Sequence, residues 1–247
     1  MPSTPEYMTT SFSPASQDVD PNKRLRLTAF LQKTQEAAEI HAALYGCGYP
    51  DLIAQNIVWV LSRVRVEMVR MPEWGEPVRL ETWHKRVERI FALRDFMLYD
   101  THNEPIVRAT SAWLLMDIHT RRMLRVEYVL PHLGQVNIPR DAICALPDKL
   151  NTPKEGALQL LHSHQAVYSD IDLINHVTNT KYVEWALDQM SLKQIETMTA
   201  FQINFNLEAR YGDQVDLWGY SGHEEGTQYI EGRRGEQNLF QSLCFWG

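Results

Sequence analysis

The sequence predicts an α+β protein in which one structural unit, a long helix followed by an antiparallel sheet, occurs twice. Residues 28–45 carry apolar side chains at helical spacing, and residues 58–68 then alternate strictly, as in a half-buried strand. The same order returns at 179–193 and 201–208. Shorter strand-like runs follow each pair, so each half is expected to pack one helix against one sheet.

In the first half, the helix is predicted from one apolar face, and Gly46 is its expected stop. That face consists of Phe30, Leu31, Thr34, Ala37, Ala38 and His41. In the strand "VWVLSRVRVEM", the even-numbered residues from Val58 to Met68 are expected to share one face. Further strands are predicted near 76–87, 91–100 and 105–118, the last entering the turn "HTRR".

In the second half, the helix is predicted from apolar residues at i, i+3, i+4 and i+7, namely Val183, Ala186, Leu187 and Met190. The strand "FQINFNLE" places Phe201 and Ile203 on an apolar face, with Gln202, Asn204, Asn206 and Glu208 on the opposite one. Strands near 213–221, 227–232 and 237–246 complete the expected sheet.

The two halves also match residue by residue. "WGEPV" at 74–78 corresponds to "YGDQV" at 211–215 with an offset of 137, and the helices align with an offset of 152, which pairs Asp20 with Asp172. The difference between the two offsets falls in the loop "YGCGYPDLIAQN", which is found only in the first half. We expect a disordered tail (1–17), a first unit (18–133), a linker (134–160) and a second unit (161–247).

Composition narrows the class of protein. The chain of 247 residues is 44% apolar and 22% charged, as in ordinary globular proteins, and no apolar run reaches the roughly 18 residues of a membrane span. Three widely spaced cysteines indicate thiols of a reducing compartment, so a cytoplasmic location is expected. Residues 151–247 carry 6 basic and 13 acidic residues, and no basic stripe interleaved with aromatics occurs, which disfavours a nucleic-acid partner.

Four stretches, taken in order, resemble one family. They are "WVLSRVRVEMVRMPEWGEPVRLETW" (59–83), "RDFMLYD" with "RATSAWLLMDIHTRR" (94–122), "SDIDLINHVTNTKYVEW" (169–185) and "EARYGD" (208–213). They are similar to the acyl-acyl carrier protein thioesterases of bacteria and plant plastids. The resemblance implies a tandem double hot-dog fold, with the catalytic motif in the second unit. It also implies hydrolysis of acyl-carrier thioesters to free fatty acid and holo-carrier, which ends fatty acid synthesis.

The polar cluster before the second helix contains the candidate catalytic residues. In the family a motif resembling D-x-N-x-H supplies the catalytic Asp, Asn and His, which correspond here to Asp172, Ile174 and His176. A histidine can polarise a carbonyl or carry a proton, an aspartate can orient it, and a helix N-terminus attracts an oxyanion. Capping of the helix explains the same polar residues without catalysis, and for Asp170 a cap or a solvated turn is the preferred interpretation.

The resemblance makes Glu208 a candidate general base for water, whereas the pattern alone fits a solvent-facing carboxylate. Ile174 departs from the family because it cannot form a hydrogen bond, and Asn175 is a candidate substitute. Ala209 stands where plant members carry a cysteine, and no cysteine lies in a matching motif. We therefore expect direct attack by water, with no cofactor and no metal. His162 and His164 share a strand face but have no third ligand nearby.

The expected partner is the acyl carrier protein, with its phosphopantetheine-linked acyl chain. Arg121 and Arg122 in the "HTRR" turn are candidate docking residues, together with other basic residues on first-half strands. That group comprises Arg79, Lys85, Arg86, Arg89, Arg94 and Arg125. A solvated sheet face is the competing interpretation. Two functional rivals stay open, an acyl-CoA thioesterase and a catalytically weakened acyl-binding protein, and a homodimer is also left open.

Overall fold

The computed structural model describes residues 5–143, 146–153, 158–220 and 226–246, and the chain divides into two units, Met1–Pro147 and Asp148–Gly247. The division falls inside the segment 134–160 that the sequence predicts as a linker. None of the helices in the described part of the chain is long and apolar enough to cross a membrane. Of the three cysteines, Cys47 and Cys244 are buried free thiols, and Cys144 lies outside the described residues.

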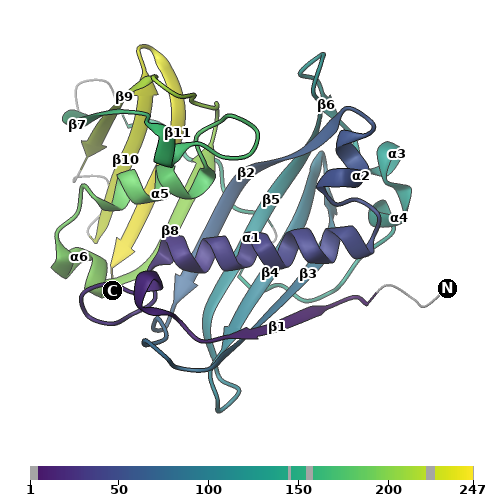
Figure 1. Cartoon of the computed structure of the whole chain (residues 1–247), viewed down its shortest axis with the longest axis horizontal. Coiled ribbons are helices and arrows are strands. Elements are labelled where there is room, and N and C mark those ends of the chain that lie inside the picture. Colours follow the sequence, from purple (N-terminus) through teal and green to yellow (C-terminus); the bar gives the residue numbers. More distant parts are fainter. Residues whose placement is uncertain (1–4, 144–145, 154–157, 221–225, 247) are drawn as a thin grey trace. The chain divides into compact units, whose positions relative to one another are not determined.

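The first unit is an antiparallel sheet crossed on one face by the long helix α1, Leu27–Leu44 (Figure 1). The strands pair in the order β1-β3-β4-β5-β2, and β6 pairs with β5. Their bounds are β1 Met8–Phe12, β2 Ile57–Met68, β3 Val78–Glu88, β4 Phe91–Tyr99, β5 Pro105–Asp117 and β6 Met123–Leu124. The short helices are η1 Ser16–Asp18, α2 Tyr49–Ile53, α3 Val126–Val129 and α4 Pro131–Gly134. The predicted α+β class and the long first helix are confirmed.

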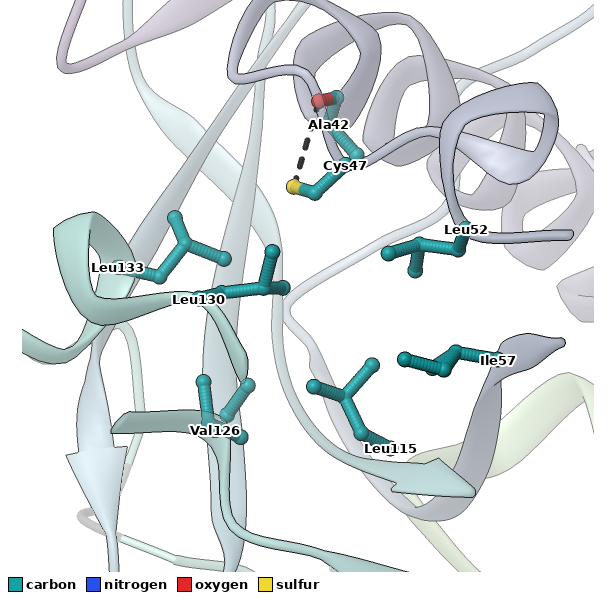
Figure 2. Packing of buried hydrophobic residues seen from close by; sticks show 9 residues of the cluster. Ala42, Cys47, Leu52, Ile57, Leu115, Val126, Leu130 and Leu133 are labelled. Carbon is teal, nitrogen blue, oxygen red and sulfur yellow. Dashed lines mark hydrogen bonds between the residues drawn. The ribbon is translucent and has the colours of Figure 1, made fainter. Parts of the chain in front are cut away.

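The loop found only in the first half has a packing role. It forms α2 and brings Cys47 and Leu52 into a buried cluster with residues of the sheet. The cluster also contains Val126 of α3, Leu133 of α4 and Leu130 between these two helices. Figure 2 shows this cluster, with the Cys47 thiol directed at the carbonyl oxygen of Ala42, 3.3 Å away. The insertion therefore supplies apolar side chains that close this part of the first unit.

Two details of the first unit correct the sequence prediction. The stretch 1–17 is not wholly a disordered tail, because Met8–Phe12 forms β1 and pairs with β3. Its Ser/Thr-rich composition suggested disorder, but threonine suits a strand once an edge with free backbone groups is available. In β2, the register shifts between Leu61 and Arg63, so odd-numbered residues are buried before the shift and even-numbered ones after it. One extra residue in a bulge reverses which side chains face the core.

The second unit repeats this layout with a shorter helix, α5, Asn179–Leu187. Its strands pair in the order β8-β11-β10-β9-β7, all antiparallel. Their bounds are β7 Gln159–Gln165, β8 Met198–Phe205, β9 Gln214–Tyr220, β10 Thr227–Arg234 and β11 Gln237–Trp246, with helices η2 Tyr168–Asp170 and α6 Leu192–Thr197. The predicted helix over 179–193 is too long, because Ser191 caps a new helix, α6, through its bond from the Gln194 N–H.

The strand before Glu208 is also shorter than predicted. β8 ends at Phe205, and the N–H groups of Asn206 and Leu207 both donate to the carbonyl oxygen of Leu239, which ends the regular ladder. Glu208 therefore does not share a strand face with Gln202 and Asn204. Those two side chains are buried, and the amide of Gln202 donates to the carbonyl oxygen of Asp148 at 2.7 Å. The segment that precedes β7 thus contacts Gln202 on this strand.

Candidate active site in the second unit

The residues between η2 and α5 form a closed turn that carries the predicted catalytic motif. Ile171 bridges to Val177, the Asp172 N–H donates to the His176 carbonyl oxygen at 2.8 Å, and the Asn175 N–H donates to the Asp172 carbonyl oxygen at 3.1 Å. Asn175 has a φ of 70°, a left-handed conformation that asparagine tolerates better than most residues. Because α5 begins only at Asn179, Asp172 and His176 lie in this turn and not in the first turn of the helix.

The carboxylate of Asp172 stabilises this turn. Its Oδ1 accepts hydrogen bonds from the N–H groups of Ile174 at 3.0 Å and His176 at 3.1 Å. Asp172 therefore holds the backbone of His176. The family motif suggested that it orients the imidazole, and these contacts position the ring only indirectly. Ile174 is 44% exposed, so no packed core depends on its side chain.

The first unit contains the same turn without a histidine. Oδ1 of Asp20 accepts from the N–H groups of Asn22 at 2.8 Å and Arg24 at 2.9 Å, and Lys23 has a φ of 62°. The sequence alignment of Asp20 with Asp172 is therefore confirmed by geometry, and Arg24 occupies the place of His176. Since the carboxylate makes equivalent bonds in both copies, these bonds stabilise the duplicated fold, whereas the imidazole occurs only in the second copy.

One backbone hydrogen bond brings the turn next to the segment that contains Glu208. The N–H of Val177, which follows His176, donates to the carbonyl oxygen of Ala209, which follows Glu208, at 2.8 Å. The Ala209 N–H donates to the hydroxyl of Tyr182 on α5 at 2.7 Å. Glu208 is half-buried in this place. Burial raises the pKa of Tyr182 to about 12, and the negative charge of Glu208 acts in the same direction.

Asp170 is buried beneath the turn. Its Oδ2 accepts from the N–H of Val167 at 2.9 Å and lies 3.0 Å from Nε2 of His164, whose ring packs on Trp185 with the centroids 4.5 Å apart. Its Oδ1 lies 3.8 Å from the Lys181 ammonium. Asp170 does not cap α5, because its carboxylate accepts from Val167, the N-cap residue of the short helix η2. The solvated interpretation is also wrong, because the charge is satisfied inside the fold.

His164 is engaged by Asp170, which removes it from the candidate metal pair with His162. Across the described ranges of the chain, no group of three or more histidine, cysteine, aspartate or glutamate side chains is arranged to hold a metal ion. Thr178 is the N-cap residue of α5, but its side chain makes no capping hydrogen bond. The polar groups before α5 therefore stabilise the preceding turn more than the helix itself.

The basic residues of the first unit do not all face solvent. Lys85 is fully buried and lies 3.0 Å from Asp95 and 2.8 Å from Asp141, and Arg94 is also buried, so neither can contact a docked protein. Exposed basic side chains remain at Arg89, Arg121, Arg122 and Arg125. The turns that contain Arg89 and Arg121 lie at the same end of the sheet, because Ala92 pairs with Trp113 between β4 and β5.

Comparison with known structures defines the fold class. The chain is similar to an acyl-ACP thioesterase from Bacteroides thetaiotaomicron, with a TM-score of 0.88 and 24% identity over 98% of both chains. It is also similar to the 12:0-ACP thioesterase from Umbellularia californica, with a TM-score of 0.83 and 23% identity over 98% of both chains. These likenesses concern the fold, and they match the tandem double hot-dog fold predicted from the sequence.

The family follows from the sequence models. The model of the acyl-ACP thioesterase N-terminal domain matches residues 5–130, and that of the C-terminal domain matches residues 155–239. The chain therefore belongs to the acyl-ACP thioesterase family. It is 28% identical to the chloroplastic oleoyl-acyl carrier protein thioesterase of Coriandrum sativum, over 81% of this chain and 58% of that protein. It is 27% identical to the chloroplastic palmitoyl-acyl carrier protein thioesterase of Arabidopsis thaliana, over 76% and 50%. The chain thus spans little more than half the length of these relatives.

The structure predicts different roles for Ile174 and Asn175. Replacing Asn175 by glycine removes the amide but suits the positive φ, so the fold should survive, whereas alanine there adds about 1–2 kcal/mol of strain. We expect Asn175→Gly to leave turnover of a thioester substrate nearly unchanged. We expect Ile174→Asn to raise turnover and, because Ile174 is exposed, to alter the unfolding free energy by only about 0.5 kcal/mol. The alternative is that Asn175 supplies the missing amide. That would follow if folded Asn175→Gly lost about a hundredfold in turnover and Ile174→Asn did not raise turnover.

Proposed function

We propose that the protein is an acyl-acyl carrier protein hydrolase that releases free fatty acid and holo-carrier and so ends fatty acid synthesis. The observation that carries this proposal is the Val177–Ala209 hydrogen bond, which joins the His176 turn to the Glu208 segment in a chain of this family. The relatives named above are described as acting on oleoyl- and palmitoyl-carrier thioesters. The buried free thiols of Cys47 and Cys244 support a reducing, cytoplasmic compartment.

In the proposed mechanism, the Glu208 carboxylate accepts a proton from a water molecule whose oxygen attacks the thioester carbon. His176 polarises the carbonyl oxygen, and the carbon–sulfur bond then breaks, with the proton passing to the leaving thiolate. Asp172 positions His176 through its backbone. A cysteine acyl-enzyme is disfavoured among the described thiols, because burial raises the pKa of Cys47 to about 11 and raises that of Cys244 further.

The direct test is release of free acid from a panel of acyl-carrier and acyl-CoA substrates with the same chains. We expect the carrier-linked thioesters to have the higher kcat/KM. Equal or higher kcat/KM for the CoA thioesters would support the acyl-CoA rival. Binding of acyl chains without turnover of either substrate would support the acyl-binding rival, for which the exposed Ile174 in place of the family's asparagine is the motivation.

The duplicated turn provides a matched control for Asp172. Asparagine keeps an oxygen that can accept both backbone bonds but lacks the negative charge that strengthens them. Asp172→Asn and Asp20→Asn should therefore each cost about 1–2 kcal/mol of unfolding free energy. If the charge of Asp172 also acts on His176 during catalysis, only Asp172→Asn should lower kcat, by about tenfold or more. Thermal unfolding and kcat of both variants check this. Equal kcat values would restrict Asp172 to stabilising the turn.

Carrier docking is assigned to the exposed arginines at the turn end of the first-unit sheet. Charge reversal in Arg121→Glu and Arg122→Glu should raise KM for the carrier-linked substrate several-fold, and added salt should weaken that substrate's hydrolysis. A small soluble thioester should be unaffected. Arg108→Glu is the control, since Arg108 is exposed on β5 near the opposite end of the same strand. The same KM change for Arg108→Glu would remove the docking role from Arg121 and Arg122.

A further inference from the structure

The peptide group that follows Glu208 is held by a side chain of α5. The hydroxyl of Tyr182 accepts a hydrogen bond from the Ala209 N–H at 2.7 Å, and both residues are buried. That N–H belongs to the planar peptide group between Glu208 and Ala209. The bond therefore fixes the direction in which the backbone leaves Glu208.

Aromatic neighbours fix the ring of Tyr182. Its centroid lies 5.3 Å from that of Phe240 and 5.4 Å from that of Trp185, so the side chain cannot turn away from Ala209 without disturbing close-packed rings. Because burial raises the pKa of Tyr182 to about 12, its hydroxyl stays neutral near pH 7. Tyr182 thus presents a rigid, uncharged acceptor to the backbone beside Glu208.

The first unit contains the same backbone link at the equivalent place. The Leu25 N–H donates to the Pro72 carbonyl oxygen at 2.8 Å, the distance also found between Val177 and Ala209 in the second unit. Pro72 aligns with Ala209 at the offset of 137 and is likewise buried. Proline has no N–H, so the first unit needs no acceptor at this place.

The helix residue changes together with the segment residue. Phe30 and Tyr182 are each the fourth residue of their helix, and both are buried. The second unit therefore has both the hydroxyl and the N–H at these positions, and the first unit has neither, although both units form the backbone link. The fold forms without the tyrosine bond. That bond occurs in the unit that contains Glu208, whose aligned position in the first unit is Met71.

We propose that Tyr182 is a positioning residue for Glu208, because its hydroxyl fixes the peptide after Glu208 and so holds the carboxylate in place for water activation. The proposal rests on the proposed role of Glu208 as general base. On the other side of Glu208, the Leu207 N–H donates to the Leu239 carbonyl oxygen, so the backbone is held both before and after this residue. A misplacement of about 1 Å in a reacting geometry can cost about a hundredfold in rate.

Tyr182→Phe keeps the ring and removes only the acceptor. We expect it to lower kcat about ten- to a hundredfold with little change in KM, because positioning acts on the chemical step. The substrate is an acyl-carrier thioester, or an acyl-CoA thioester if the wild type hydrolyses only that. In a Glu208→Gln background the same substitution should not lower kcat further, since no base is left to place. Wild-type kcat in Tyr182→Phe, or an equal loss in the Glu208→Gln background, would overturn the proposal.

A double variant separates positioning from stability and covers the case in which Tyr182→Phe does not fold. Tyr182→Phe leaves the buried Ala209 N–H unpaired and should lower the melting temperature. Adding Ala209→Pro removes that N–H and gives the second unit the Phe and Pro of the first. We expect the melting temperature to recover while kcat stays low. Recovery of kcat together with the melting temperature would make the bond purely structural and overturn the proposal.

Tyr229→Phe is the matched control, because it removes another buried tyrosine hydroxyl of the same unit. That hydroxyl donates to Glu231, and Tyr229 lies on the opposite face of the sheet from Phe240, since it is three residues from Gly232, the partner of Phe240. Tyr229→Phe should lower the melting temperature without lowering kcat. A kcat loss equal to that of Tyr182→Phe would overturn the proposal.

The same measurements distinguish this proposal from the proposed function. A wild type that hydrolyses neither thioester, or a Glu208→Gln variant with wild-type kcat, would overturn the proposed chemistry and the role of Tyr182 together. A large loss in Glu208→Gln beside a fully active Tyr182→Phe would overturn the role of Tyr182 alone.

Discussion

Glu208→Gln is expected to lower turnover of an acyl-carrier substrate by about 10²–10⁴, the contribution typical of a general base. Glutamine has nearly the same volume but cannot accept the proton of the attacking water. The backbone contacts of the segment should persist, because the Val177–Ala209 and Ala209–Tyr182 hydrogen bonds do not involve the Glu208 side chain. Single-turnover release of free acid, with circular dichroism to check folding, measures the effect.

Glu184→Gln is the matched control for this substitution. Glu184 lies on α5 of the same unit, its carboxylate is 45% exposed, and it pairs with Lys181 at 3.0 Å. An exposed pair of this kind contributes little to stability, so neither turnover nor unfolding should change much. If Glu208→Gln were as active as Glu184→Gln, water activation would have to be reassigned to another group.

His176→Arg is expected to lower turnover by about 10²–10³ while the turn keeps its conformation. The first unit already shows that arginine fits this place, because Arg24 donates its N–H to Asp20 in the equivalent turn. The guanidinium can also donate hydrogen bonds, but it lies at the end of a longer side chain, so it does not place an N–H where the imidazole polarises the carbonyl oxygen. The kcat and melting temperature of the variant test this directly.

The reciprocal substitution Arg24→His is the control, since it places an imidazole on the same turn in the unit that lacks an equivalent of Glu208. Position 71, which aligns with Glu208 at the offset of 137, is a methionine. We expect Arg24→His to leave turnover unchanged. A His176→Arg enzyme with wild-type kcat would show that the imidazole takes no part in the reaction.

Most of the elements could be predicted from the sequence, because helical and strand periods are local properties. The face of α1 that contains Phe30, Ala37 and His41 is buried as predicted, and the alignment of Asp20 with Asp172 holds at the level of individual hydrogen bonds. The errors occur where one residue changes the geometry. The bulge at Leu61–Arg63 reverses the buried face of β2, and the double donation to Leu239 ends β8 before Glu208.

The α+β class and the duplication could be inferred from the sequence, because periodic patterns and repeated segments are visible along the chain. The sequence placed Asp172 and His176 before the second helix, but the closed turn that holds them was found only in the structure. Only the tertiary structure decided which charged groups are available and which lie together. Lys85 and Arg94 are buried although a strand pattern alone favours exposed basic residues. The segment that contains Glu208 is joined to the His176 turn by the Val177–Ala209 hydrogen bond. Such contacts join residues far apart in the chain, so their formation depends on the packing of the whole unit and leaves no periodic signal in the sequence.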